Sequence, residues 1–276
     1  MILDLPDLRI LSLSSLLPHE ENDRQRTQPL VNRLQSDGNL RNPPIVAPPR
    51  NGSEKYVVLD GINRIAAFQT MNLPHILVQV AQPYEPHLIL NTWNHLIWGM
   101  TVDAFMTGIN DIKGLRVQPT KDESPPDFDP ECTPIQFLLP EGKTYFADLT
   151  PDVNRIAALL RAVVSSYKNR ANIDRTSQIQ IEALKSIHRD LTALIIFPSF
   201  DVNTIFHMAL NGCLLPSGIT RFIVSPRALH VNYPLEELAS PKTTAEKNTR
   251  LQKWIQECLL NKSVRYYAEA TFLFDD

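Results

Sequence analysis

The stretch KYVVLDGINRIAAFQTMN, residues 55–72, decides the fold. Its first part, residues 55–60, is rich in β-branched residues and predicts a strand. Gly61 follows directly, and apolar residues then recur at helical spacing, which predicts a helix over residues 62–72. A strand that passes into a helix through a single glycine is typical of an α/β unit.

Segments on both sides extend this unit. Short apolar and alternating patterns predict strands over residues 8–17, 43–49 and 75–81, and a helix over residues 19–37. Prolines border several of these segments and limit where the strands can begin and end. We therefore expect an α/β domain at residues 1–82.

The rest of the chain predicts a second lobe of the α+β class. A long helix is expected over residues 87–114, and a proline-rich, acidic loop over residues 119–131. The elements expected beyond this loop are a hairpin at 134–148, helices at 151–167 (with Thr150 as its cap), 178–191, 201–211 and 243–258, and strands at 194–197, 219–224 and 263–274. We therefore expect a helical connector with its loop at residues 83–131 and an α+β lobe at residues 132–276 that contributes to a substrate site.

Composition excludes two common kinds of phosphate site. The chain has 276 residues, with 22 prolines and only 9 glycines. No two glycines stand in a G-x-G spacing and no G-x-x-x-x-G-K-[ST] occurs, so the dinucleotide fingerprint and the P-loop are both missing from the sequence. A phosphate would have to be bound without a glycine-rich loop.

Charge and cysteine content narrow the class further. A net charge of -3 does not give the basic footprint expected of a nucleic-acid-binding protein. No apolar run approaches the ~20 residues that a membrane helix needs, and the first residues, MILDLPDLRI, lack the basic start of a secretory signal. The 3 cysteines form no C-x-x-C pair, which favours reduced thiols in a cytoplasmic protein.

The turn LDGINR, residues 59–64, has the chemistry of an anion site. A helix N-terminus presents free N–H groups, and Gly61 allows a ligand to approach them closely. Arg64 can fork onto a phosphate, Asn63 can donate an amide hydrogen, and Asp60 can hold Mg²⁺ or accept a hydroxyl proton. The same pattern also fits a plain turn in which Asp60 only caps the helix and Arg64 is solvated.

Other polar and aromatic residues could also serve a ligand. In LPSGITRFIVSPR, residues 215–227, Thr220 with the two arginines Arg221 and Arg227 suits a carboxylate or a phosphate, although an amphipathic strand with Arg221 in water fits equally. The aromatic group of Trp93, His95 and Trp98 could line an adenine or amino-acid pocket. Its spacing instead favours Trp93 in the core and His95 in a packed surface pair with Trp98.

Three motifs together resemble the ParB/sulfiredoxin superfamily, and within it the free-serine kinase branch. They are P-H-E-E at residues 18–21, P-I-V at residues 44–46 and L-D-G-I-N-R at residues 59–64, in the order and at the spacing of that branch. The segment at residues 215–227 resembles a C-terminal stretch of the same branch. Sulfiredoxins need a cysteine where this chain has Ile62, which excludes sulfiredoxin chemistry.

The resemblance implies a ParB/sulfiredoxin-like nucleotide-binding domain at residues 1–82, and a phosphotransferase that uses ATP or ADP with Mg²⁺. The residues it assigns to the nucleotide phosphates are Asp60, Gly61, Asn63 and Arg64, with Asp60 also as a catalytic residue and metal ligand. It assigns Glu20 as the general base on the hydroxyl of free L-serine or a similar amino acid, with Thr220 and Arg221 binding that substrate. Glu20 also fits the first turn of a helix, where the dipole alone favours an acid.

Three functions therefore stay open: a small-molecule kinase, a ParB-like nucleotide-binding regulator of DNA or a partner protein, and a relative that only binds a metabolite. Ile62 and Asn63 replace two histidines of the branch, which supports the third. The region after residue 82 is neither markedly basic nor all-helical, which favours the two-lobed kinase over a ParB-type DNA module. We expect a protein that binds a nucleotide and a small amino acid, with no membrane segment and with its oligomeric state left open.

Overall fold

The computed structural model describes residues 5–50, 52–83, 88–120, 134–149 and 152–267. The first lobe is built on a sheet with strand order β1-β6-β4-β5-β2. Its strands are β1 (Asp7–Ser12), β2 (Leu16–Leu17), β4 (Ile45–Ala47), β5 (Tyr56–Asp60) and β6 (His75–Val80), with helices α1 (Arg24–Asp37) and α2 (Ile62–Thr70). The core of this lobe contains Ile10, Val58 and Phe68, each no more than 1% exposed. The mixed α/β class predicted from the sequence is confirmed.

The start of α1 differs from the prediction. The helix expected from residue 19 begins only at Arg24, because Asp23 is its N-cap and its side chain accepts a hydrogen bond from the Gln25 N–H. The preceding residues are extended, and Glu20 forms an isolated parallel bridge with Leu215. The interpretation of Glu20 as a first-turn helix residue is therefore wrong.

The second lobe is built on a six-stranded sheet with strand order β12-β8-β13-β10-β11-β9. The strands are β8 (Asn94–Trp98), β9 (Val117–Thr120), β10 (Ile135–Leu138), β11 (Thr144–Ala147), β12 (Asn172–Thr176) and β13 (Leu191–Ile196), packed with helices α3 (Val102–Asn110) and α4 (Val153–Tyr167). Its core includes Phe105, Phe137 and Tyr167. The hairpin predicted at residues 134–148 is confirmed as the antiparallel pair β10–β11.

The predicted helix over residues 87–114 is wrong. Its described part contains β7 (Leu88–Thr92), then β8, and only then α3. β7 pairs with the distant β14 (Thr220–Val224), so the partner that makes this segment a strand lies far along the chain. The described part of the connector expected at residues 83–131 thus holds strands on both sides of one helix and ends in β9; residues 121–131 of its loop lie outside the described residues.

Two further elements of the second lobe differ from the prediction. The helix predicted over residues 178–191 is limited to α5 (Ile181–Lys185), and β12 was not predicted at all. The strand predicted over residues 263–274 is not found at residues 263–267, which have no regular structure, and the rest of it lies outside the described range.

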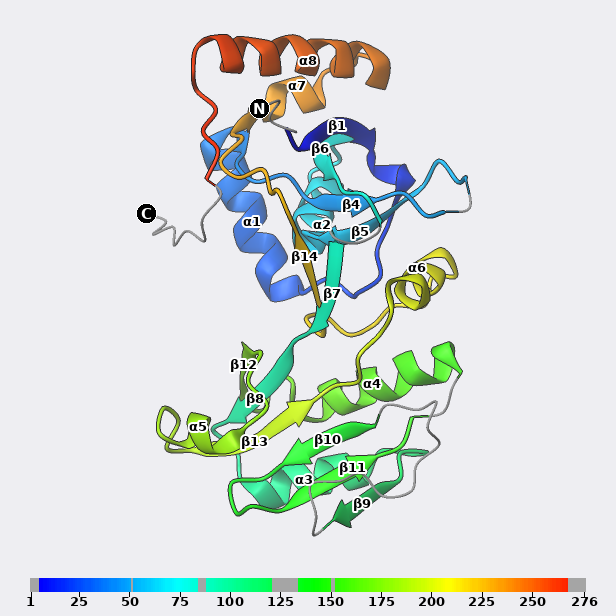
Figure 1. The fold of residues 1–276 in the computed structure, drawn as a ribbon, viewed down its shortest axis with the longest axis vertical. Helices are drawn as coiled ribbons and strands as arrows, with labels where there is room; N and C mark the ends of the chain where they lie inside the picture. The colour runs from blue at the N-terminus through cyan, green and yellow to red at the C-terminus, as the bar shows by residue number, and fades with distance from the viewer. Residues whose placement is uncertain (1–4, 51, 84–87, 121–133, 150–151, 268–276) are drawn as a thin grey trace.

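The chain returns to the first lobe after the second is complete. The ribbon of β7 and β14 runs between the lobes (Figure 1), and α6 (Val202–Leu210) packs beside β5. The remaining elements are η1 (Leu13–Ser15), β3 (Asn39–Leu40), β15 (Tyr233–Pro234), α7 (Leu235–Ala239) and α8 (Thr244–Leu260). The capping box of Thr243 and Glu246 starts α8, which packs on β1. Within the part of the chain that the structure describes, no helix is long and apolar enough to cross a membrane.

Candidate functional site

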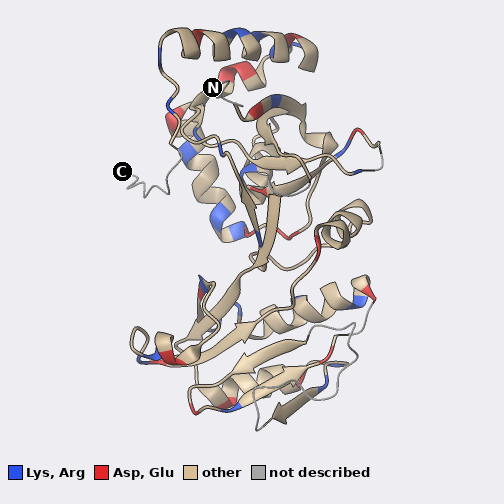
Figure 2. Cartoon of the chain, in the orientation of Figure 1, with Lys and Arg blue, Asp and Glu red and all other residues tan. Residues whose placement is uncertain are grey.

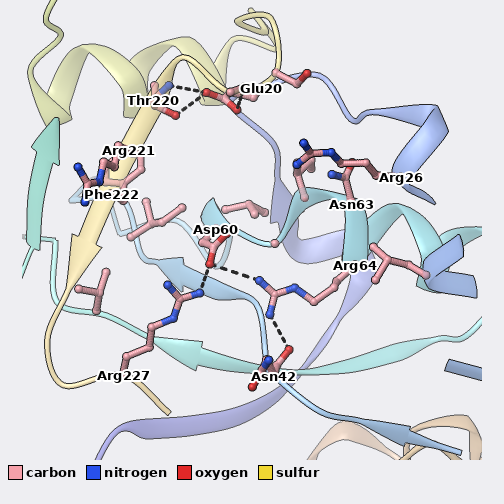
Figure 3. A pocket seen from close by; sticks show the side chains of 18 of the residues that line it. Glu20, Arg26, Asn42, Asp60, Asn63, Arg64, Thr220, Arg221, Phe222 and Arg227 are labelled. Carbon is pink, nitrogen blue, oxygen red and sulfur yellow. Dashed lines mark hydrogen bonds and ion pairs between the residues drawn. The ribbon is translucent and has the colours of Figure 1, made fainter. Parts of the chain in front are cut away.

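A cleft of about 820 Å³ lies where β14 passes the turn between β5 and α2 (Figure 3). All the site residues predicted from the sequence line it: Glu20, Asp60, Gly61, Asn63, Arg64, Thr220 and Arg221. They come from segments up to about 200 residues apart, as the bond between Glu20 and Thr220 shows. The fold therefore brings residues of the P-H-E-E, L-D-G-I-N-R and 215–227 segments into one cavity.

The turn between β5 and α2 is shaped around Gly61. This residue is the N-cap of α2, with a φ of 92° and no side-chain cap bond. A Cβ at this position would lie 2.8 Å from Nη2 of Arg64, because the guanidinium rests against the glycine. The start of α2 thus carries backbone N–H groups that no side chain caps, and the interpretation of Asp60 as the cap is wrong.

Asp60 is an ionised carboxylate between two arginines. Its Oδ2 accepts a hydrogen bond from Arg64 Nη2 at 3.3 Å and another from Arg227 Nη2. Burial by itself would raise the pKa of Asp60, but the charges of Arg64 and Arg227, with the Gly61 N–H, outweigh it and lower that pKa. The carboxylate therefore stays charged beside the turn between β5 and α2.

Arg64 is fixed in place rather than solvated. Its Nη1 donates to the carbonyl oxygens of Asn42 at 2.6 Å and Pro43 at 3.1 Å, and only 18% of its side chain is exposed. Burial lowers the pKa of Arg64 and the charge of Asp60 opposes that shift. Three of the five guanidinium hydrogens are used in these bonds, which leaves two for a ligand.

Asn63 joins the starts of the two helices of the first lobe. Its Oδ1 accepts a hydrogen bond from the backbone N–H of Asp23 at 2.8 Å. Because this bond uses the amide oxygen, the amide nitrogen is left to donate into the cleft.

Glu20 is held by the segment that leads into β14. Its Oε1 accepts bonds from Ile219 N at 3.1 Å, Thr220 N at 2.7 Å and Thr220 Oγ1 at 2.6 Å, while its Oε2 accepts one from Gly218 N at 2.7 Å. The residue is only 8% exposed. Oε1 is thus saturated by donors, and Oε2 keeps the capacity to accept a further proton or hydrogen bond.

His19 extends this network behind Glu20. Its Nδ1 lies 2.5 Å from the Val58 carbonyl and so must donate, while its Nε2 lies 2.7 Å from Thr220 Oγ1. Burial lowers the pKa of His19, partly opposed by the charge of Glu20 and by the Val58 carbonyl. The single Thr220 hydroxyl proton lies between two acceptors, His19 Nε2 and Glu20 Oε1, so this hydroxyl links the two side chains.

The aromatic side of the cleft is formed by Trp93. The Arg221 guanidinium lies 4.2 Å from the centre of the Trp93 ring, so Arg221 does not project freely into water. Trp93 lines the cleft rather than lying in the core, contrary to the preferred interpretation of its spacing.

His95 supports the Glu20 segment from below and was not predicted as a site residue. It is 2% exposed, its Nε2 donates to the Gly218 carbonyl at 3.3 Å, and its Nδ1 accepts from the Tyr167 hydroxyl at 2.9 Å. Burial lowers the pKa of His95 to about 4, against the bond to Gly218, which raises it. The expected surface pair with Trp98 is wrong, because Trp98 lies beside His188.

The cleft is strongly basic. Seven arginines line it, against three acidic residues, although the whole chain carries a net charge of -3. Blue bands on α1 in Figure 2 mark its arginines, of which Arg26 and Arg33 line the cleft. Arg227 was proposed from the sequence together with Arg221, and the arginines that line the cleft without having been proposed are Arg26, Arg33, Arg41 and Arg175. Such a surface favours a ligand with several negative charges.

Comparison with known proteins gives two similar sequences, whereas no protein-family model matches the chain. The chain is 22% identical over 278 residues to the ATP-dependent L-serine kinase SbnI of Staphylococcus aureus, covering 97% of each protein. It is 26% identical over 130 residues to an ATP-dependent L-serine kinase of Staphylothermus marinus, and this match covers only 50% of that relative.

Solved structures of serine kinases have a similar fold. The structure of C-terminally truncated SbnI from Staphylococcus aureus superposes with a TM-score of 0.71 at 18% identity, covering 92% of this chain and 97% of that one. Free serine kinase in complex with AMP superposes with a TM-score of 0.67 at 15% identity, covering 86% and 98%. The chain is therefore homologous to ATP-dependent L-serine kinases and shares their fold.

Proposed function

We propose that this protein is a small-molecule kinase that transfers the γ-phosphate of ATP to the hydroxyl of free L-serine, with ADP as the alternative donor. The observation that carries the proposal is the position of Glu20, a buried carboxylate with one oxygen still able to accept, in the same arginine-lined cleft as the uncapped start of α2. The homology to ATP-dependent L-serine kinases supports the same activity. The D-G-x-x-R turn also supports membership of the first lobe in the ParB/sulfiredoxin superfamily.

The nucleotide phosphates would bind at the turn between β5 and α2. The backbone N–H groups at the start of α2, the amide nitrogen of Asn63 and the two remaining hydrogens of Arg64 supply donors there. Asp60 would hold Mg²⁺ as a single carboxylate ligand, with phosphate oxygens and water completing the shell. This fits the chemistry of the site, since no group of three metal-ligating side chains occurs among the described residues.

Glu20 would act as the general base. The acceptor hydroxyl donates to Oε2, its proton passes to that oxygen as the new O–P bond forms, and the bond to the bridging oxygen of the donor breaks to release ADP, or AMP when ADP is the donor. Positive charge from Arg64 and Arg227 near the phosphates would offset the charge that develops during transfer.

The test is a phosphorus NMR assay of purified protein with Mg²⁺, L-serine and either ATP or ADP. O-phosphoserine is expected to form, and Glu20→Gln should reduce its rate by about 10²- to 10⁴-fold while nucleotide affinity is retained. Glu21→Gln is the matched control, because the neighbouring Glu21 side chain is 43% exposed and lies outside the cleft lining. Equal rates in Glu20→Gln and wild type would contradict the role of Glu20.

A second candidate is a relative that binds nucleotide without transferring phosphate. Ile62 lines the cleft in a position where the serine-kinase branch has a histidine, and an isoleucine side chain cannot bond a phosphate or carry a proton. No phosphoserine, together with nucleotide affinity that is lost in Arg64→Ala, would favour this candidate. DNA binding that weakens steeply with salt would instead favour a ParB-like regulator.

A further inference from the structure

A second cavity of about 780 Å³ opens beside the cleft. It lies between the C-terminal end of α4, the strand β12 and the start of α1, and it shares Arg26, Arg175 and Ser217 with the cleft. Lys168 and Arg170 add positive charge to its wall. The two cavities therefore adjoin each other at Arg26, Arg175 and Ser217.

Arg175 is a cation without a partner at this junction. Among the described residues its guanidinium makes no hydrogen bond and no ion pair. Other arginines near the junction are engaged: Arg26 lies 3.6 Å from Asp23, and Arg221 stacks on Trp93. Arg175 thus keeps all five N–H donors for a ligand.

The backbone of Gly218 places Arg175 next to Glu20. Gly218 has a φ of 87°, and a Cβ there would lie 2.0 Å from Nη2 of Arg175, so the guanidinium lies flat on this residue. The N–H of the same Gly218 donates to Glu20 Oε2, the oxygen that is still able to accept. A group bonded to Oε2 therefore lies beside the guanidinium of Arg175.

The strand pairing keeps this arrangement rigid. Arg175 in β12 is directly opposite His95 in β8, and opposite residues project to the same face of a sheet. His95 holds the carbonyl of Gly218 while Arg175 covers its α-carbon. Gly218, which both Arg175 and His95 contact, thus sets the position of Arg175 relative to Glu20.

We propose that Arg175 binds the α-carboxylate of the phosphate acceptor. The inference rests on the proposed function, since it takes Oε2 of Glu20 as the site of the acceptor hydroxyl. In a 3-hydroxy-2-amino acid only two carbons separate the hydroxyl from the carboxylate. When the hydroxyl is bonded to Oε2 of Glu20, the carboxylate therefore lies next to the guanidinium of Arg175. A guanidinium can bind a carboxylate with two parallel hydrogen bonds. The acceptor class is then a free hydroxy amino acid, because a serine within a polypeptide has no such carboxylate.

The test compares L-serine with L-serinamide, which lacks the charged carboxylate, in wild type and Arg175→Met. Loss of a charged hydrogen-bonded pair should reduce kcat/KM for L-serine by about 10- to 100-fold in the variant, with the value for L-serinamide and the KM for ATP unchanged. Arg175→Lys should restore part of the preference for the carboxylate. Arg250→Met, on the distant helix α8, is the matched arginine control.

The outcomes separate this inference from the proposed function. An unchanged preference for L-serine in Arg175→Met, or its loss in Arg221→Met instead, would overturn the assignment to Arg175. If wild type transfers no phosphate, the proposed function fails, and calorimetric binding of L-serine in the presence of ADP then decides. Binding that Arg175→Met abolishes supports the carboxylate site, and equal binding in both proteins, or none in wild type, overturns it. Thermal melting confirms that each variant is folded.

Discussion

The buried imidazole of His95 makes a specific prediction about pH and stability. In the folded protein burial lowers the pKa of His95 to about 4, from 6.5 in an exposed histidine. Below 6.5 the unfolded chain therefore takes up a proton that the folded protein does not. Stability from this residue is present above pH 6.5 and is lost as the pH falls towards 4.

The magnitude follows from these two values. Between about pH 7.5 and about pH 4.5, the difference in proton binding at one such site lowers the free energy of unfolding by about 2.5 kcal/mol. That is a sizeable part of the stability of an ordinary domain. The proton would add at Nδ1, which accepts from the Tyr167 hydroxyl, so protonation would remove the bond to Tyr167 while Nε2 could still donate to Gly218.

Urea unfolding at a series of pH values measures this effect. His95→Gln keeps an amide that can donate to Gly218 but does not titrate, so its stability should fall by about 2.5 kcal/mol less than that of wild type over the same range. His207→Gln removes an exposed imidazole on α6 and should follow the wild-type curve. Parallel curves for wild type and His95→Gln would refute the reasoning.

Three further predictions concern the turn at β5 and the last helix. Gly61→Val places a side chain against Arg64 at a φ of 92°, so ATP affinity measured by calorimetry should be lost while the circular dichroism spectrum is kept; unchanged affinity would argue strongly against the site. Asp60→Asn should weaken nucleotide binding more with Mg²⁺ than without it, and equal losses would remove Asp60 as a metal ligand. Thr243→Ala removes the capping box of α8 and should cost about 1 kcal/mol in urea unfolding, a loss that Thr249→Ala should not reproduce.

The geometry of the turn between β5 and α2 was predictable because its parts are adjacent in the sequence. Asp60, Gly61 and Arg64 lie within five positions, and a strand followed by a glycine and a helix fixes their geometry locally. Glu20 and Thr220 were each proposed, but their contact joins residues 200 positions apart. Periodicity carries no information about such a pairing.

Two missed residues, His95 and Arg175, lie in strands whose sequences are not typical of strands. β12, NIDRT, is an edge strand with a mostly exposed, polar sequence, so it shows no apolar alternation. The sequence therefore did not indicate that Arg175 lies in a strand beside the site. β8, NHLIW, is buried along most of its length because β12 and β13 flank it, and the sequence predicted a helix over this segment instead. In both cases distant partners, rather than local preference, determine the structure.

The packing of α8 on β1 has a consequence for how the molecule folds. The side chain of Asn248 bonds both the N–H and the carbonyl of Ile10, 238 positions earlier, and Leu251 completes the same core as Val58 and Phe68. A chain emerging from the ribosome cannot finish its first domain until the whole second lobe has been synthesised. Such high contact order predicts slow folding, with the second lobe able to assemble while the first still waits for its final helix.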